Sequence, residues 1–277
     1  MDNQLMYVAN LVITRIFGAL LSPFSGLSPI WGLLAVSVVT GIVLVVIFKY
    51  TSNQAAIRKT KEKISAYFLQ IRLFKDDLGL MLDAQKRILR TNLTYMKYSV
   101  VPMLIMLVPV VLILIQLGIR YENRPLRPGE SAVVKLKFGE PIEALPVLVE
   151  ASDGIKLETP LLRLPEDREI DVRIGALSEG EHHLVVVIDG QRITTPVRVS
   201  NRIECVYPER EKYAFAGILF APGQKPLPQD SPLESVSFIL PRRELNVFGL
   251  SVHWLVFFFV VSVAAGYSLK GVFKVQV

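Results

Sequence analysis

Two long apolar segments flank a basic stretch, and this pattern constrains the fold more than any other feature of the chain. Residues 31–48 and 98–119 contain no charged residue, and each is close to the roughly 20 residues that a helix needs to cross a bilayer. Between them, residues 49–97 hold eleven Lys or Arg and four Asp or Glu, a net charge of +7. The pattern predicts a membrane span at residues 31–50, a water-exposed segment at residues 51–97 and a second span at residues 98–119.

The water-exposed segment carries a seven-residue apolar repeat, which is typical of helices that wind around each other. The repeat breaks at residues 76–79, where the chain folds back so that both ends enter the same membrane. We therefore expect a coiled-coil hairpin whose two arms pack along the repeated positions. These positions are Ile57, Ile64 and Ile71, with Tyr67 and Phe74, in the first arm, and Leu82, Leu89 and Met96 in the second.

The composition indicates an integral membrane protein. Hydrophobic residues make up 51% of the chain and its mean hydropathy is +0.42, which is too apolar for an ordinary soluble domain. The whole chain has a net charge of +6, so the residues outside the basic stretch sum to −1. A basic loop between two spans is typical of the cytoplasmic side, and no aromatic-and-basic recognition motif accompanies it. We expect membrane lipids as partners and no specific nucleic acid.

Residues 1–30 predict a helix that lies in the membrane interface. Leu5 to Leu21 is apolar but carries Arg15, which suits an interfacial helix; a further full span over the same residues remains open. The segment lacks a basic start and a small-residue cleavage site, so a removable signal peptide is not expected.

Residues 120–205 change character and predict an all-β domain. Short alternating segments are separated by turn signals, and Asp189-Gly190 between two such segments indicates a hairpin. Six or seven short strands in this length favour an immunoglobulin-like sandwich. We expect these strands at residues 132–138, 145–150, 154–162, 169–174, 182–188 and 192–199.

The last part of the chain predicts a third span. Residues 206–246 read either as a loop or as extra strands, and residues 247–269 are apolar, with His253 and Trp254 near one end and Tyr267 near the other, as in the aromatic belts of membrane spans. With the hairpin in the cytoplasm, the N-terminus and the β domain lie outside and the tail at residues 270–277 lies inside.

No motif for covalent catalysis occurs in the sequence, and we expect no enzyme, no cofactor and no metal. His182 and His183 are adjacent on a predicted strand, so their side chains point to opposite faces and do not form a metal pair. His253 at the end of a span fits either an ionisable group in a cavity or an interfacial anchor. The only cysteine, Cys205, has no partner for an internal disulfide.

Taken together, these features resemble the YidC–Oxa insertase superfamily, especially its short three-span members, such as the archaeal YidC-like proteins and the insertase subunit of the eukaryotic ER membrane complex. The resemblance rests on the first span, the basic hairpin and the stretch Met-Lys-Tyr-Ser-Val-Val-Pro-Met at residues 96–103, followed by Pro109. It covers about a third of the chain.

The resemblance implies a helper for inserting membrane proteins, in which a groove between the core spans lowers the cost of moving polar groups into the bilayer. The hairpin would receive nascent membrane proteins or the ribosome, in a bacterial or archaeal cell membrane. The implied groove residues are Ser37, Thr40, Ser99, Gln116 and Ser262, with Met103 and Met106 for apolar contact.

Two other functions fit the sequence. The chain could be a non-catalytic scaffold or accessory subunit of a larger membrane complex, with the hairpin and the β domain docking other subunits. A sensor that passes an outer signal to the hairpin fits less well, because no output domain follows. A polar patch between the spans would favour an insertase, and a fully apolar, tightly packed interior would favour a scaffold.

Overall fold

The computed structural model describes residues 2–24, 26–74, 76–143, 145–212, 224–247 and 249–273, with side chains from residue 11 onwards. Two compact units divide the chain. The first comprises the residues up to Gly32 and Leu114–Trp254, and the second comprises Leu33–Ile113 and the residues from Leu255 onwards. The first unit holds the β domain and the second holds the hairpin.

The helical part consists of a few long elements. α2 and α4 are long and apolar enough to cross a membrane, judged by length and composition, whereas α6 is a shorter apolar helix. The sequence prediction of long apolar helices combined with a β domain is therefore confirmed at this coarser level. The described helices are α1 (Asp2–Leu21), the 3₁₀ turn η1 (Ser22–Phe24), α2 (Pro29–Thr51), α3 (Gln54–Leu73), α4 (Leu78–Tyr121) and α6 (Trp254–Leu269).

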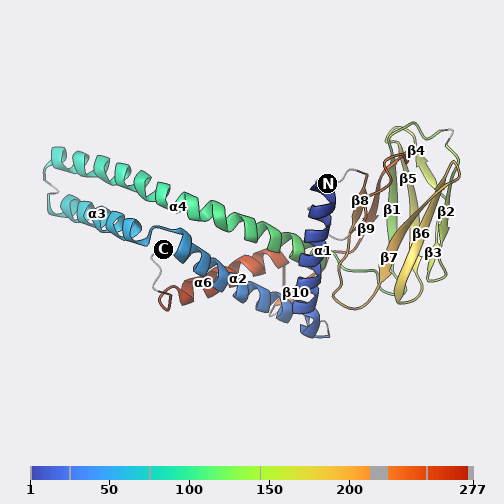
Figure 1. The fold of residues 1–277 in the computed structure, drawn as a ribbon, viewed down its shortest axis with the longest axis horizontal. Coiled ribbons are helices and arrows are strands. Elements are labelled where there is room, and N and C mark those ends of the chain that lie inside the picture. Colours follow the sequence, from blue (N-terminus) through green and yellow to red (C-terminus); the bar gives the residue numbers. More distant parts are fainter. Residues whose placement is uncertain are drawn as a thin grey trace. The chain divides into compact units, whose positions relative to one another are not determined.

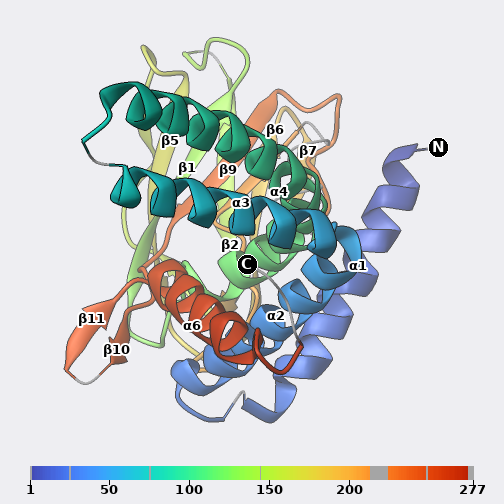
Figure 2. The ribbon, with the colours of Figure 1, turned by 90° about the vertical axis from the view of Figure 1, so that its left-hand side faces the viewer.

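α3 and α4 form an antiparallel helical pair, as the two views in Figures 1 and 2 show. Asn53 caps α3, because its side chain accepts a hydrogen bond from the backbone N–H of Ala56. Asp77 does the same for α4 by accepting from the N–H of Leu80 at 3.0 Å. Polar side chains therefore cap the N-terminal ends of both helices, and Asp77 does so at the turn between them.

The packing face of the second arm differs from the prediction. In α3, Ile57 is buried as expected, but in α4 Leu82, Leu89 and Met96 are 65%, 66% and 56% exposed. In the hairpin arm of α4, residues 78–97, the buried residue is Ala84. Ala84 belongs to a row of residues that lies beside the predicted row on the helix surface. The further members of this row, Ile88, Thr91 and Tyr95, are half-buried. A seven-residue repeat fits either row equally well, so the sequence alone did not distinguish the two faces of this arm.

The second arm and the second span form one continuous helix. α4 runs from Leu78 to Tyr121 without interruption and contains Pro102 and Pro109. A proline in a helix removes one backbone hydrogen bond, but both residues lie in the apolar half, where the helix nevertheless continues.

The β domain contains two antiparallel sheets that share one hydrophobic core (Figure 1). The larger sheet has the order β3-β5-β1-β9-β8, with β4 also paired to β5, and the smaller one has the order β2-β6-β7. Alternate residues of β1 and β5 point inward, which matches the alternation in the sequence. The strands of this domain are β1 (Ser131–Phe138), β2 (Val147–Ala151), β3 (Ile155–Leu157), β4 (Leu162–Leu164), β5 (Glu169–Ala176), β6 (Gly180–Ile188), β7 (Gln191–Val199), β8 (Glu209–Glu211) and β9 (Leu233–Ile239).

Two turns show how local sequence shapes this domain. The β6–β7 hairpin closes through Asp189 and Gly190, both with positive φ (46° and 82°), as the Asp-Gly signal predicts. The single strand expected at residues 154–162 is instead divided into β3 and β4. Pro160 lies between them and has no N–H to donate to a sheet.

The region at residues 206–246 contributes strands to the sheet. β9 pairs along β1, with Val134 opposite Phe238 and Leu136 opposite Val236. A small hairpin follows, made of β10 (Leu245–Val247) and β11 (Leu250–Val252). α6 therefore begins at Trp254 and not at residue 247, because the first residues of the expected span pair as strands. The apolar segment at residues 213–222 lies outside the described residues.

Candidate functional site

An apolar cavity of about 320 Å³ lies in the second unit, between α2, α4 and α6. Nearly every side chain around it is aliphatic or aromatic, so it suits apolar groups and not ions. Its lining residues are Gly41, Leu44, Val45 and Phe48 from α2, Met106 and Val110 from α4, and Phe258, Phe259, Ser262, Val263, Gly266 and Tyr267 from α6.

Two glycines let α2 and α6 approach beside this cavity. A Cβ atom on Gly41 would lie only 2.4 Å from the backbone oxygen of Ser262, and one on Gly266 would lie 3.2 Å from a methyl group of Val45. Small residues at a crossing of two apolar helices are typical of membrane proteins, where close backbone approach replaces the hydrophobic driving force. The cavity is thus lined by the close crossing of α2 and α6 and by larger side chains such as Phe258 and Phe259.

The predicted polar residues of this unit bond to their own helices. Ser37 donates to the oxygen of Leu33 and Thr40 to that of Val36, both at 2.7 Å. Ser262 donates to the oxygen of Phe259 at 3.1 Å, and Ser99 makes the same kind of bond within α4. Of the predicted groove residues, the structure brings Met106 and Ser262 together at the cavity, but Ser37, Thr40, Ser99 and Met103 do not line it.

Gln116 belongs to the first unit and forms a buried polar cluster with Arg120 and Thr14. Arg120 donates to the backbone oxygen of Gln116 at 2.8 Å and to its side-chain oxygen at 2.9 Å. Gln116 donates to the hydroxyl of Thr14 at 3.0 Å, and Arg120 donates to the Thr14 backbone oxygen at 3.1 Å. The cluster ties α1 to the end of α4.

Sequence reasoning missed Arg120. It stands four residues after Gln116 and directly ends the apolar run of the second span, so a pair of polar residues on one helix face was visible. The burial of Arg120 could not be seen in the sequence, because its partner Thr14 is more than 100 residues away in the chain.

Glu122 contacts two side chains at the start of α6, those of Trp254 and His253. It accepts a hydrogen bond from the indole N–H of Trp254 at 2.6 Å, and His253 lies 3.4 Å from the same carboxylate oxygen. His253 thus lies beside a carboxylate at the helix end. This position agrees with an anchoring role.

The described residues contain no group of three or more His, Cys, Asp or Glu side chains that could hold a metal ion. His182 bonds through its ring to the backbone oxygen of Ser178 at 2.8 Å. Its ring also occupies the space next to Gly154, where a Cβ atom would lie 1.7 Å from the ring. His182 therefore packs against a turn that needs glycine.

The comparison with family models found no match, and the comparisons with curated proteins and with solved structures found none either.

Proposed function

We propose that this protein is a membrane-protein insertase or chaperone of the YidC–Oxa type. In this proposal α2, the apolar half of α4 and α6 cross the membrane, the basic hairpin lies in the cytoplasm and the β domain lies outside. The activity requires no covalent step, since its work is to lower the cost of transferring a segment from water into lipid.

The observation that carries the proposal is the apolar cavity between α2, α4 and α6. A cavity between membrane helices, lined by aliphatic and aromatic side chains and by Met106, offers contact to apolar side chains of many shapes, because methionine is flexible and polarisable. Such a site fits a transient apolar guest, such as the leading face of a nascent span.

The length of α6 also supports this function. α6 has 16 residues, which corresponds to about 24 Å at roughly 1.5 Å per residue. This is shorter than a hydrocarbon core of roughly 30 Å. A short span is accommodated by thinning the bilayer around it, and a thinner bilayer lowers the barrier that a polar segment must cross.

The hairpin supplies a surface for incoming chains. Residues 49–97 have a net charge of +7, whereas the rest of the chain sums to −1, and the exposed face of the hairpin also presents apolar side chains. A basic surface with exposed apolar groups suits nascent chains or the ribosome. The exposed apolar residues include Phe68, Leu69, Leu73, Leu78, Leu82, Leu89 and Leu93.

We further propose an immunoglobulin-like sandwich for the β domain. The smaller sheet, β2-β6-β7, corresponds to the C-F-G order of such domains, and β1, β5 and β3 with β4 correspond to B, E and D. The A position beside β1 is taken by β9, which comes from the end of the domain and not from its beginning. A module of this kind suits docking or spacing on the outer side.

Site-specific photo-crosslinking in membranes tests the insertase function. Probes at Met106 and Ser262, both at the cavity, should crosslink to many different nascent membrane proteins during their synthesis. A probe at Val101, which is exposed on the same helix as Met106 but does not line the cavity, is the matched control and should crosslink mainly to lipid. Equal crosslinking of nascent chains from Val101 and Met106 would contradict a substrate site in the cavity.

The main alternative is a scaffold or accessory subunit of a larger membrane complex. The observation in its favour is that Ser37, Thr40 and Ser262 satisfy their hydroxyl groups within their own helices, as in plain helix packing. In that case one permanent partner helix fills the cavity, and the Met106 probe captures a single protein in stoichiometric yield.

A further inference from the structure

A second cavity, of about 300 Å³, lies in the first unit at the end of α4. Its lining combines apolar side chains with polar and charged ones. The apolar lining residues include Leu21, Phe24 and Ile203, and the polar or charged ones include Arg120, Tyr121, Arg198, Glu204 and Cys205.

Arg120 brings a buried positive charge to this cavity without an acidic partner. The side chain is 4% exposed, and its hydrogen bonds go to two backbone oxygens and one amide oxygen. Within the described part of the chain no carboxylate forms an ion pair with it. A buried charge is costly unless an opposite charge or a full set of hydrogen bonds compensates it, so the site favours an anion.

The neighbouring charges do not neutralise Arg120. Glu204 shares the cavity, but one of its oxygens accepts from Arg198 at 2.7 Å and the other from Ser200 at 3.0 Å. Arg243 adds a second guanidinium, which donates to the backbone oxygen of Arg120 at 3.1 Å. One nitrogen of Arg243 is also buried without a partner among the described residues.

Tyr121 supplies an unused donor at the same place. Its side chain is fully buried, and its hydroxyl has no hydrogen-bond partner in the described residues. The hydroxyl fits against α2 only because residue 32 is glycine, where a Cβ atom would lie 2.7 Å away. A buried hydroxyl without a partner is uncommon in folded proteins and calls for a ligand or an ordered water.

The position of the cavity indicates the kind of anion. Arg120 and Tyr121 end the apolar run of α4, and Gly32 stands at the start of the apolar run of α2. In the membrane orientation proposed above, on which this step rests, these residues lie where hydrocarbon gives way to headgroups. Apolar and cationic side chains lining one cavity at that level match a phosphate attached to acyl chains.

We propose that this cavity binds a phosphate group, carried by an anionic phospholipid or free in solution, with Arg120 as its charge partner and the Tyr121 hydroxyl as a further donor. A guanidinium matches the geometry of phosphate oxygens and holds them through two parallel N–H groups. Bound phosphate would neutralise the charge of Arg120 and give the Tyr121 hydroxyl an acceptor.

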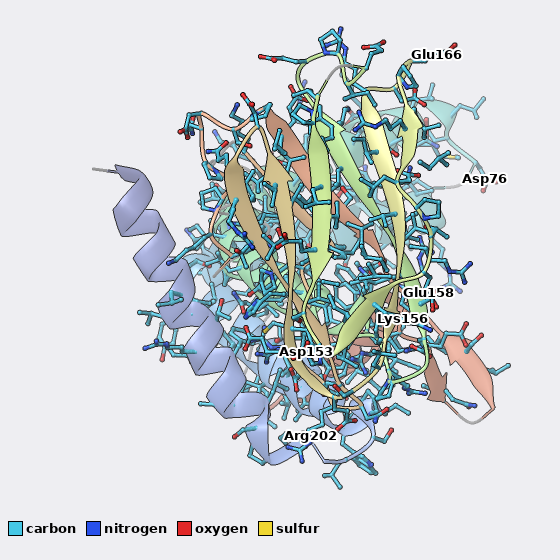
Figure 3. All side chains as sticks on the ribbon, turned by 90° about the vertical axis from the view of Figure 1, so that its right-hand side faces the viewer. Asp76, Asp153, Lys156, Glu158, Glu166 and Arg202 are labelled. Carbon is cyan, nitrogen blue, oxygen red and sulfur yellow. The ribbon has the colours of Figure 1, made fainter. Side chains whose placement is uncertain are left out.

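Native mass spectrometry of the purified full chain in neutral detergent tests the proposal. Dioleoylphosphatidylglycerol should bind to the wild type as one retained molecule. Arg120→Met should weaken this binding by about 10- to 100-fold, and Tyr121→Phe by about 3- to 10-fold. Arg202→Met is the matched control. Arg202 is exposed (Figure 3) and directly precedes Ile203, which lines the cavity, and its replacement should leave binding unchanged.

A thermal melt separates ligand binding from a structural role. Arg120→Met also loses three hydrogen bonds to Gln116 and Thr14, so each protein is compared with its own melt without phospholipid. With phosphatidylglycerol only the wild type should gain stability. Inorganic phosphate that stabilises the wild type as well as the lipid does identifies free phosphate as the ligand, and stabilisation by the lipid alone identifies the headgroup.

Two outcomes overturn the proposal. One is equal phosphatidylglycerol binding by the wild type, Arg120→Met and Tyr121→Phe. The other is no effect of either phosphate source on the wild type. Tyr121→Phe removes only an unpartnered hydroxyl, so it should fold even if Arg120→Met does not. Both measurements are made without any insertion reaction, so their failure is distinct from failure of the insertase function.

Discussion

Gly41 lets α2 and α6 approach more closely than any residue with a side chain would allow. The atom nearest to its missing Cβ is a backbone oxygen of α6, which cannot turn aside as a flexible side chain would. The sequence shows Gly41 only as one small residue within the apolar run 31–48, and the residue it approaches on α6, Ser262, is far away in the chain.

Gly41→Ala should therefore destabilise the protein by about 1–3 kcal/mol, because the added methyl group forces the helices apart. Gly18→Ala is the matched control in another helix, since no atom lies within 4 Å of its Cβ position. It should be neutral or stabilising by roughly 0.5–1 kcal/mol. Thermal unfolding of the full chain in detergent measures both. Equal midpoints for the two variants would show that the crossing at Gly41 is not tight.

Glu130 is a residue whose ionisation should contribute to stability in acid. It accepts two hydrogen bonds from Arg124, at 2.6 and 2.9 Å, and one from the backbone N–H of Arg127. The hydrogen bond from Arg124 lowers the pKa of Glu130 below its ordinary value of 4.5. Since the folded pKa is below the unfolded one, the stabilisation is present above pH 4.5 and is lost as the pH falls through the folded pKa.

Glu130→Gln should remove this dependence. The stability difference between the wild type and the variant should be constant near neutral pH and shrink as the pH falls below 4.5, as measured by denaturant unfolding. A difference that stays constant through this range would mean that Glu130 does not titrate with folding.

At the scale of elements, the hairpin shows what sequence patterns can and cannot predict. The seven-residue repeat correctly indicated two helices and a turn, and the face of α3 that carries Ile57. It did not indicate the face of α4, because two neighbouring rows of that helix both fit a heptad. The β domain is similar: alternation and the Asp-Gly turn predicted most strands, but the pairing of β9 with β1 joins distant segments and has no local signal.

Two truncations distinguish the packing face from the exposed face of the hairpin. Ile57→Ala should cost about 2–5 kcal/mol, because it leaves a cavity at a buried position. Leu89→Ala should change stability by less than about 0.5 kcal/mol, because the side chain is 66% exposed. Circular dichroism during thermal unfolding reports both. A larger loss of stability for Leu89→Ala than for Ile57→Ala would show that Leu89 lies on the packing face of α4, as the sequence repeat predicted.

At the scale of the whole molecule, the proposal places the hairpin and the β domain on opposite sides of a membrane. The charge distribution in the sequence predicts this topology, and α2 and α4 are long and apolar enough to cross a membrane. The order of these parts was predicted from the positions of the apolar runs and the charges along the sequence. The polar cluster around Arg120 could not be predicted, since it depends on a contact between α1 and α4.

Accessibility of single cysteines tests the topology. In a Cys205→Ser background, Asp76→Cys marks the hairpin turn and Asp153→Cys marks a turn of the β domain; both positions are exposed and are labelled in Figure 3. A membrane-impermeant maleimide should label Asp153→Cys on intact cells and Asp76→Cys only after the membrane is opened. Labelling of both from the same side would contradict the three-span arrangement.

The most direct test of the central claim is insertion by the purified protein in liposomes. The full chain should raise the protease-protected fraction of a nascent single-span membrane protein several-fold over protein-free liposomes. Met106→Trp, which fills the cavity, should return it towards background, whereas Val101→Trp on the same helix should not. No gain over empty liposomes, or equal activity of the two variants, would contradict an insertase that works through this cavity.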